Sequence, residues 1–560
     1  MCSANGNCIK LALLVSGTGL PVWQYEMVQR LREIPHVSIV LVLQRSGKQQ
    51  DWSEKLIGKV TGFFSYLEAV ALGWKGQADK LCDVKPLLEN TPVLDTGLPA
   101  ARQIFEAGRI DLLIDLQGHA PAEDYFYATS SQQIWRYFYS ENRALQPERA
   151  GVREYAAGRN RFVSGVISQG LCGKVHYLLV AHNGINRPLF TQNVDQMLWK
   201  IADFIPHLLR QISTVEALHQ HVQQRHDHCL TQIPEQLREN RKIVSNDVPL
   251  SAAWQLLGRG LKQTGVKVWN RVQWTQVQEQ WILLLGSADV FRQETDVSKL
   301  PRLRKIIPPP DRFWADPFLV SEAGREYVFF EELIYRQGKG TLACMELFPD
   351  QSHGQPVTVM DKPYHLSYPF IFRFQGQLYM VPESAENRTL DLYRCEQFPS
   401  RWVKVKTIMT DVEAYDATLY EDEQGCWWLF VCMRHHEYAS TNELLYLFSA
   451  ADPLTDDWEP HPCNPVVTDA ATARPAGNLL RLNGKLYRPS QNCAASYGRG
   501  LNLNEVLALN KQEYREQAGS QLIPAGYAGL DGVHTLNCLN DKVVSDGILL
   551  HKRSWFRKKD

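Results

Sequence analysis

The sequence predicts a multidomain protein with an N-terminal α/β domain built on a Rossmann-type parallel sheet, a helical connector, and a C-terminal all-β five-bladed β-propeller. Three observations lead to this fold class. The chain has 560 residues, more than one hydrophobic core usually supports. Strand-like and helix-like segments alternate in its first third. In its second half, a two-strand pattern recurs five times at intervals of about 50 to 60 residues, the length of a propeller blade.

The first region, residues 1–212, alternates short apolar runs with amphipathic segments. Residues 11–15 are apolar and end in a glycine-containing turn at 16–19, and residues 25–31 follow with helical spacing. With a further apolar run at 110–116, the pattern predicts a mostly parallel sheet and places any ligand at its carboxyl edge. The turn lacks the glycine spacing of dinucleotide sites and a Walker lysine, which favours a simple turn over a phosphate cradle.

Residues 213–278 are rich in Gln, Arg, Lys and His and indicate a helical connector. Within it, residues 252–274 place apolar side chains near helical intervals beside basic ones, a pattern that would also suit peripheral contact with a membrane surface. Three glycines interrupt the pattern. Packing against neighbouring domains is therefore the favoured interpretation, and membrane contact is the alternative.

Composition argues against several classes of partner. With 60 Lys and Arg against 61 Asp and Glu, no global charge draws the chain to nucleic acid or anionic lipid. No apolar run reaches the ~18 residues of a membrane span, and the N-terminus lacks the features of a signal peptide. The 12 Cys are scattered without metal-ligand spacing, which argues against structural zinc and against a disulfide framework. We expect a cytoplasmic protein without a metal or cofactor.

Five segments of the C-terminal region, residues 279–560, share one plan: a short motif, an apolar strand, a hairpin turn and a second strand, mostly rich in aromatic residues. The turns carry glycine or an Asn-Asp pair, as hairpins require. In a propeller the innermost strand of each blade runs along the central axis, so equivalent positions converge around one funnel. Function is expected at that funnel. The five motifs are anchored at Asp316, Pro369, Asp416, Pro475 and Gly532.

The funnel offers carboxylates for chemistry on a sugar. Asp316, Asp416 and, from a second strand, Glu383 are the candidate catalytic residues, because acid/base work at an anomeric centre needs one carboxyl group to protonate the leaving oxygen and another to activate water or attack. The alternative for each Asp is a structural role, capping a strand end or accepting backbone N–H groups. His534 is a binding candidate whose alternative is a hydrogen-bonded spacer.

Further residues of these motifs are expected to bind the substrate, a carbohydrate or a nucleotide sugar. The rings of Trp314, Tyr368 and Tyr415 suit the faces of pyranose rings. Arg388 and Arg474 suit a carboxylate or phosphate, which guanidinium groups bind in bidentate fashion. The remaining polar candidates are Glu332, Asn442 and Asn492.

The runs FWADPF, YHLSYPFIF, VPESAENRTLDLYRC and ARPAGNLLRLNGKLYRPSQNC resemble the propeller domain that opens the plant glucosamine inositolphosphorylceramide transferases, over about 260 residues. That domain is similar to the propellers of arabinanase- and fructosidase-type glycosidases, whose catalytic carboxylates lie on inner strands. In the plant enzymes, sugar transfer is attributed to a different, C-terminal domain. The resemblance therefore implies that this propeller handles glycans, but it supports no particular reaction as firmly. Relatives tend to have an acidic residue where this chain has Asn492, and an amide there would weaken catalysis.

The N-terminal region resembles formyltransferases in VSGTGLPVWQYEMVQRL and DLLIDLQG, with a departure at the catalytic motif. Relatives have a His-His-Gly-Asp type motif before a shared Asn-Arg pair, whereas this chain has Phe-Tyr-Ser-Glu at residues 138–141. The aspartate expected later is replaced by Cys172. Formyl transfer needs an imidazole for the proton that leaves the amine and an aspartate to orient it. The resemblance therefore implies a formyltransferase-like domain with a degenerate catalytic motif.

These observations predict a carbohydrate-active protein, a glycosidase- or glycosyltransferase-like enzyme that acts on a surface glycan, glycolipid or nucleotide sugar through the propeller funnel. One alternative is a non-catalytic glycan-binding propeller. It would hold the funnel carboxylates with Arg or Lys and leave no free pair at the ~5–10 Å separation that glycosidases use. The other alternative is a formyl or acyl transferase acting through the N-terminal domain, which would bind folate. The sequence indicates no oligomeric state.

Overall fold

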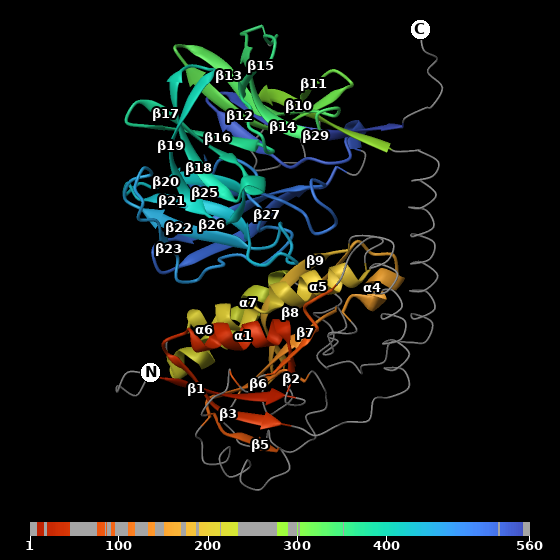
Figure 1. Ribbon diagram of the computed structural model, residues 1–560, viewed down its shortest axis with the longest axis vertical. Helices are drawn as coiled ribbons and strands as arrows, with labels where there is room; N and C mark the ends of the chain where they lie inside the picture. Colours follow the sequence, from red (N-terminus) through yellow and green to blue (C-terminus); the bar gives the residue numbers. More distant parts are fainter. Residues whose placement is uncertain are drawn as a thin grey trace. The chain divides into compact units, whose positions relative to one another are not determined.

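The chain forms two compact units in the computed structural model, one made of residues 1–266 and 438–440 and one made of residues 267–437 and 441–560. Most of their helices and strands are labelled in Figure 1. The structure describes residues 8–15, 19–44, 76–83, 86, 91–95, 110–117, 133–140, 150–169, 175–185, 190–212, 214–232, 277–288, 300, 303–350, 352–524 and 527–552.

A seven-stranded sheet forms the centre of the N-terminal unit. Its order is β5 (Val93–Asp95), β3 (Val37–Gln44), β1 (Ile9–Val15), β6 (Leu112–Asp115), β7 (Gln133–Phe138), β8 (Arg161–Gln169) and β9 (Val175–Gly184). The first five strands are parallel, but β8 is antiparallel to both of its neighbours. The sheet is thus mixed, with the antiparallel pairings confined to β8, whereas the sequence predicts a mostly parallel Rossmann-type sheet. Residues 170–174 alone join β8 to β9, and parallel neighbours need a crossover of a dozen residues or more.

Helices and a small two-stranded sheet accompany the seven strands. They are β2 (Gly19–Pro21) paired with β4 (Leu81–Asp83), and α1 (Val22–Arg32), α4 (Val152–Ala156), α5 (Phe190–Ile201) and α6 (Phe204–Arg210). In α1 the buried Trp23, Met27 and Leu31 recur at helical spacing and join the main core of this unit. The unit combines helices with a mixed sheet. The formyltransferase-like α/β domain stays a prediction.

Helix α7 (Val215–Gln232) covers the start of the predicted connector. Its Leu218 and Val222 are buried in the main core of the N-terminal unit, so this helix packs as part of that unit. The candidate membrane-contact segment, residues 252–274, lies outside the described residues, as do formyltransferase positions 141–143 and 172. Among the described helices, none has the length and apolar character needed to cross a bilayer.

Five four-stranded antiparallel sheets form the second unit, which confirms the predicted five-bladed propeller. Four blades are continuous in sequence. Blade 1 contains β12 (Arg312–Glu322), β13 (Arg325–Ile334), β14 (Lys339–Leu347) and β15 (Val357–Met360). Blade 2 contains β16 (Ser367–Phe374), β17 (Gln377–Glu383), β18 (Thr389–Gln397) and β19 (Arg401–Thr410). Blade 3 contains β20 (Glu413–Glu421), β21 (Trp427–Arg434), β22 (Leu445–Ala450) and β23 (Glu459–Pro460), and blade 4 contains β24 (Leu480–Leu482), β25 (Lys485–Gln491), β26 (Leu501–Leu509) and β27 (Tyr514–Leu522).

The fifth blade joins both ends of the propeller. From the axis outward it contains β28 (Leu536–Leu539), β29 (Lys542–Lys552), β10 (Val277–Ser287) and β11 (Arg304–Ile306), so its outer half comes from the start of the unit. Figure 1 shows β10 and β29 next to each other. Their antiparallel ladder runs from the Val277–Lys552 pair to the Ser287–Lys542 pair. These hydrogen bonds close the ring without a covalent link.

The inner strands of blades 1 to 3 share an irregularity where the candidate site lies. Each pairing with the second strand shifts register at Asp316, Tyr368 and Asp416, whose φ angles are 52°, 44° and 52°. Gly477 precedes the inner strand of blade 4 with φ 125°. Side chains rarely tolerate positive φ, so the surrounding contacts must hold these residues in place. Such bulges re-aim side chains, here toward the axis.

Hydrogen bonds between blades surround the axis. The buried Tyr368 hydroxyl of blade 2 lies 2.8 Å from Thr418 Oγ1 of blade 3 and accepts the Gly477 N–H of blade 4 at 2.6 Å. The Asn537 side chain of blade 5 donates to the Pro317 carbonyl of blade 1 at 2.7 Å. These side-chain hydrogen bonds fix the blades relative to one another near the axis, where no strand pairing joins them.

Candidate functional site

The funnel brings predicted residues from all five blades into two groups. Glu383, Asp416 and Asn442 surround Arg474, and Asp316 lies beside His534. The five motifs therefore do converge, because each inner strand starts at the same end of its blade.

Arg474 binds two of the three carboxylates predicted to be catalytic. Its Nε donates to Asp416 Oδ2 at 2.5 Å, and its Nη2 donates to Glu383 Oε2 at 3.2 Å. The Nη1 atom donates to Asn442 Oδ1 at 2.8 Å. These bonds use three of the five N–H groups of the buried guanidinium. Two carboxylates already face its positive charge, which disfavours a substrate anion, the ligand predicted for Arg474.

Asp416 has further buried partners. Gln491, at the end of β25, donates to Asp416 Oδ2 at 2.6 Å, and the backbone N–H of Asp416 donates to Glu383 Oε2 at 3.3 Å. Burial raises the pKa of Glu383 well above its ordinary value; the neighbouring Asp416 adds to this shift, while Arg474 opposes it. Glu383 therefore binds a proton more readily than an exposed glutamate.

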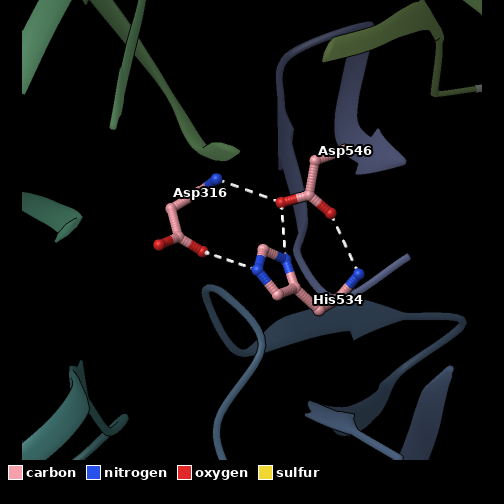
Figure 2. A group of neighbouring side chains, drawn as sticks. All are labelled: Asp316, His534 and Asp546. Carbon is pink, nitrogen blue, oxygen red and sulfur yellow. Dashed lines mark hydrogen bonds and ion pairs between the residues drawn. The ribbon is translucent and has the colours of Figure 1, made fainter. Parts of the chain in front are cut away.

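The second group links blade 5 to blade 1. Figure 2 shows His534 between the carboxyl groups of Asp546 and Asp316, with Nδ1 2.6 Å from Asp546 Oδ2 and Nε2 3.7 Å from Asp316 Oδ1. Asp546 also accepts the backbone N–H groups of Asp316 at 3.0 Å and His534 at 2.9 Å. The Thr535 hydroxyl donates to Asp316 Oδ1 at 2.9 Å. All of these side chains are buried.

Burial and charge together set the protonation of this group. Burial alone lowers the pKa of His534, but the carboxylates of Asp546 and Asp316 outweigh it and raise the pKa to about 9. Burial raises the pKa of Asp316 to about 7, against the opposing influence of His534. Ligand atoms of Asp316, His534 and Asp546 lie within 4.8 Å of one another, a spacing that a metal ion could also use. The 2.6 Å contact is that of a charge-assisted hydrogen bond, and the imidazolium supplies positive charge between the two carboxylates.

Aromatic rings cover both groups. Trp281 of β10 stacks on His534 with ring centroids 3.9 Å apart, and Tyr497 meets the same imidazole edge-on at 5.7 Å. The Arg474 Cζ atom lies over the rings of Tyr415 and Tyr497, at 5.0 and 4.9 Å from their centroids. Tyr497 exposes 46% of its surface, whereas Trp281 is buried.

A pocket of about 450 Å³ opens beside Glu383 at the junction of blades 2 and 3. Within it, Arg388 Nη1 and the Tyr415 hydroxyl both donate to Glu413, at 3.2 and 2.9 Å. Tyr415 is half-buried and contributes to the wall, while the stacking candidates Trp314 and Tyr368 are buried elsewhere. The pocket is lined by His365, Glu383, Ala385, Glu386, Arg388, Glu413 and Tyr415.

Two of the predicted binding residues have structural partners. Glu332 accepts hydrogen bonds from Trp314 Nε1 at 3.0 Å and Arg312 Nη1 at 3.1 Å. Its neighbour Glu331 lies instead beside His365 Nε2, at 3.2 Å, because successive side chains of a strand point to opposite faces. Asn492 is buried with its amide 3.4 Å from Asn502 Oδ1.

Sequence reasoning missed Trp281, Gln491, Tyr497 and Asp546. A signal existed for Asp546, which lies in the second strand of its blade as Glu383 does, in a motif that the blade pattern already contained. Gln491 ends the equivalent strand of blade 4. Trp281 and Tyr497 lie outside the inner motifs and reach the axis only through the closure of the ring.

Comparisons with known proteins find similarity to one family within the propeller. Residues 305–527 match the family described as glucosamine inositolphosphorylceramide transferase 1, N-terminal. The protein named glucosamine inositolphosphorylceramide transferase 1 of rice (Oryza sativa subsp. japonica) is 32% identical over 210 residues, which are 37% of this chain and 28% of that one. The protein of the same name from Arabidopsis thaliana is 32% identical over 210 residues, which are 27% of its length. The match therefore spans little more than a quarter of either relative.

Solved structures similar to this chain include two glycosidases. A family 117 glycoside hydrolase, Zg3597 of the marine bacterium Zobellia galactanivorans, is 12% identical, with a TM-score of 0.31 over 44% of this chain and 90% of its own. The catalytic domain of a family 62 α-L-arabinofuranosidase from Coprinopsis cinerea is 14% identical, with a TM-score of 0.32 over 42% of this chain and 90% of its own.

Proposed function

We propose that this propeller, with its match to the N-terminal part of glucosamine inositolphosphorylceramide transferase 1, binds a carbohydrate in the pocket beside Glu383. The pocket is the observation that carries the proposal. Glu386 and Glu413 line it and can accept sugar hydroxyls, Arg388 can donate, and the Tyr415 ring can pack on a pyranose face. Pockets that bind small molecules usually combine a few such polar groups with an apolar wall.

Recognition without hydrolysis is the form of this proposal that the buried charges favour. Glycosidases use two carboxyl groups with different protonation states on either side of the bond to be cleaved. Here Glu383 and Asp416 share one guanidinium, and Asp416 is almost inaccessible, with 2% of its surface exposed. Carboxylates held by arginine are what the sequence analysis expects of a glycan-binding propeller.

Sugar transfer or hydrolysis at Asp316 is the second candidate. The observation in its favour is that the pKa of Asp316 is raised to about 7, which suits a general acid at neutral pH. Asp316 is 3% exposed, so a substrate could reach it only after the covering side chains moved. The substrate would be a glycan, glycolipid or nucleotide sugar, as the sequence analysis expects.

Binding of the full chain to an array of mono- to tetrasaccharides tests the first candidate. Glu413→Gln and Tyr415→Ala should each weaken binding about tenfold or more, because each removes a contact in the pocket. The matched control is Glu322→Gln at the hairpin end of blade 1, where Glu322 pairs with the exposed Arg373. Equal affinities of Glu413→Gln and Glu322→Gln would contradict the proposal.

Product analysis separates the second candidate from the first. Bound glycans and nucleotide sugars are incubated with the wild-type chain and with Asp316→Asn, and new reducing ends or released nucleotide are measured. Turnover that the substitution abolishes, with binding retained, would support catalysis at Asp316. Absence of turnover with every bound sugar would leave recognition as the function.

A further inference from the structure

Tyr497 is an exposed aromatic side chain on a tightly held segment between β25 and β26. Its neighbour Gly498 has φ +70°, and a Cβ at that position would lie 2.8 Å from the Trp281 ring. Arg499 is fixed by Asp531 and, at 2.7 Å, by Glu279. The backbone that follows Tyr497 is therefore restrained. The ring itself contacts the guanidinium of Arg474 and the imidazole of His534, which fix its position.

Tyr497 and Tyr415 are placed by the same guanidinium. Both ring centroids lie within 5.0 Å of Arg474 Cζ, so they are at most about 10 Å apart. The guanidinium covers one face of each ring, and its nitrogens are occupied by Asp416, Glu383 and Asn442. It acts as a fixed spacer. Tyr415 adds to the pocket beside Glu383, whereas Tyr497 lies beside His534 and does not line that pocket. Tyr497 is 46% exposed as a residue, but burial of its hydroxyl end raises the pKa of that group well above the ordinary value.

We propose that the funnel binds an oligosaccharide across two subsites, the pocket beside Glu383 and a second subsite at the exposed surface of Tyr497. The inference rests on the proposed function and adds the length of the ligand to it. A monosaccharide would occupy the pocket alone. A longer glycan would continue past Arg474 and pack a further sugar ring on Tyr497, as pyranose rings pack on aromatic faces.

The chemistry of the second subsite is that of a neutral sugar. Arg474, Asp316 and His534 are buried near Tyr497. Arg474 pairs with Asp416, and His534 lies between Asp316 and Asp546. These groups therefore offer no uncompensated charge to a ligand. Binding there is expected to depend on the aromatic surface more than on ion pairs. It should therefore be insensitive to salt, because screening acts on charges.

The test measures binding of the full chain to glycans of one, two, three and four sugar units. The series is built from a saccharide of the array that the chain binds. Tyr497→Ala should weaken binding of the tri- and tetrasaccharide roughly tenfold and leave the monosaccharide unchanged. Tyr497→Phe should retain the wild-type affinity, since the ring alone makes the contact. Tyr415→Ala should weaken every length, because it alters the pocket that all of them occupy.

Phe348→Ala is the matched control, since Phe348 is an exposed aromatic residue just after β14, at the hairpin end of blade 1. It should leave all affinities unchanged. If glycans bind but affinity does not increase with length, or Tyr497→Ala weakens all lengths equally, the second subsite is refuted while the pocket stands. If no saccharide binds the wild-type chain, the proposed function and the second subsite both fail.

Discussion

Arg474 carries its positive charge in a part of the propeller from which water is almost excluded. A buried charge is tolerated only where opposite charges and hydrogen bonds compensate it, and here two carboxylates and an amide do so. The compensation is mutual, because Asp416 and Glu383 would each be a buried anion without the guanidinium. Residues that the sequence suggests as separate catalytic and binding groups therefore act as one network.

Removal of Arg474 should destabilise the propeller severely. Arg474→Met leaves Asp416 and Glu383 without their cation and should lower the free energy of unfolding by about 3–5 kcal/mol. Arg388→Met is the control, since Arg388 is 54% exposed and its pair with Glu413 should contribute less than about 1 kcal/mol. Urea denaturation of the full chain, followed by tryptophan fluorescence, measures both. A loss for Arg474→Met no larger than that for Arg388→Met would contradict the network.

The stability of the propeller should fall as the pH rises from 6.5 to 9. Folding raises the pKa of His534 from about 6.5 to about 9, so the folded state keeps a proton that the unfolded chain has lost. This contribution is complete below pH 6.5 and disappears as the pH rises through 9. The raised pKa of Asp316, about 7 against an ordinary 3.8, acts in the same direction between pH 4 and 7.

Urea midpoints measured at intervals from pH 6 to pH 9 check this dependence. The wild-type midpoint should decline more steeply than that of His534→Gln, which cannot titrate. Nitrogen NMR of the imidazole provides a readout on the wild-type chain alone, in which His534 should remain protonated at pH 8. A neutral imidazole at that pH would refute the assignment of charge.

At the scale of single elements, the inner strands depend on backbone positions that side chains rarely adopt. Gly477 is the tightest of them, because a Cβ there would lie 2.1 Å from the Leu536 carbonyl oxygen of the neighbouring blade. Gly484, in the hairpin turn of the same blade, also has a positive φ, but no atom lies within 4 Å of its Cβ position. Comparing substitutions at the two glycines therefore distinguishes the cost of a steric clash from the cost of a side chain at positive φ.

Gly477→Ala should therefore cost several times more stability than Gly484→Ala. The turn substitution should lower the free energy of unfolding by about 1 kcal/mol, the usual penalty for a side chain at positive φ. At Gly477 the clash with backbone atoms forces blades 4 and 5 apart, and we expect a loss above about 3 kcal/mol. Denaturant unfolding of both variants decides the matter, and similar losses would show that contact between the blades is loose.

Prediction from sequence succeeded best at the scale of elements. The paired strands of blades 1 to 3 lie where the motifs indicate them, since each hairpin carries its own turn chemistry and apolar strand. Choice between neighbouring residues was harder. The sequence analysis names Glu332, but its neighbour Glu331 is the one beside the pocket residue His365. The register that decides which face a side chain occupies depends on the partner strand.

At the scale of the whole molecule, the propeller is closed by two strands from opposite ends of the unit. Leu284 in β10 is fully buried in the core that blades 4 and 5 share, whereas Leu550 in β29 is 45% exposed. Leu284→Asp should abolish the cooperative unfolding transition of the propeller or lower its stability by more than about 3 kcal/mol, because it buries a charge without a partner. Leu550→Asp should cost less than about 1 kcal/mol. Hydrogen exchange of β29 amides, fast only in Leu284→Asp, would confirm that the ladder has opened.

The sequence by itself determined the number of blades, their strands and the approach of the inner motifs to one axis, since these follow from local turn chemistry and repeated patterns. Only the tertiary structure decided which carboxylates pair with which cation, and that Trp281 and Tyr497 cover them. It also decided that the N-terminal sheet is mixed. Contacts of this kind join residues up to a few hundred positions apart, and their charges are set by burial, which exists only once the ring has closed.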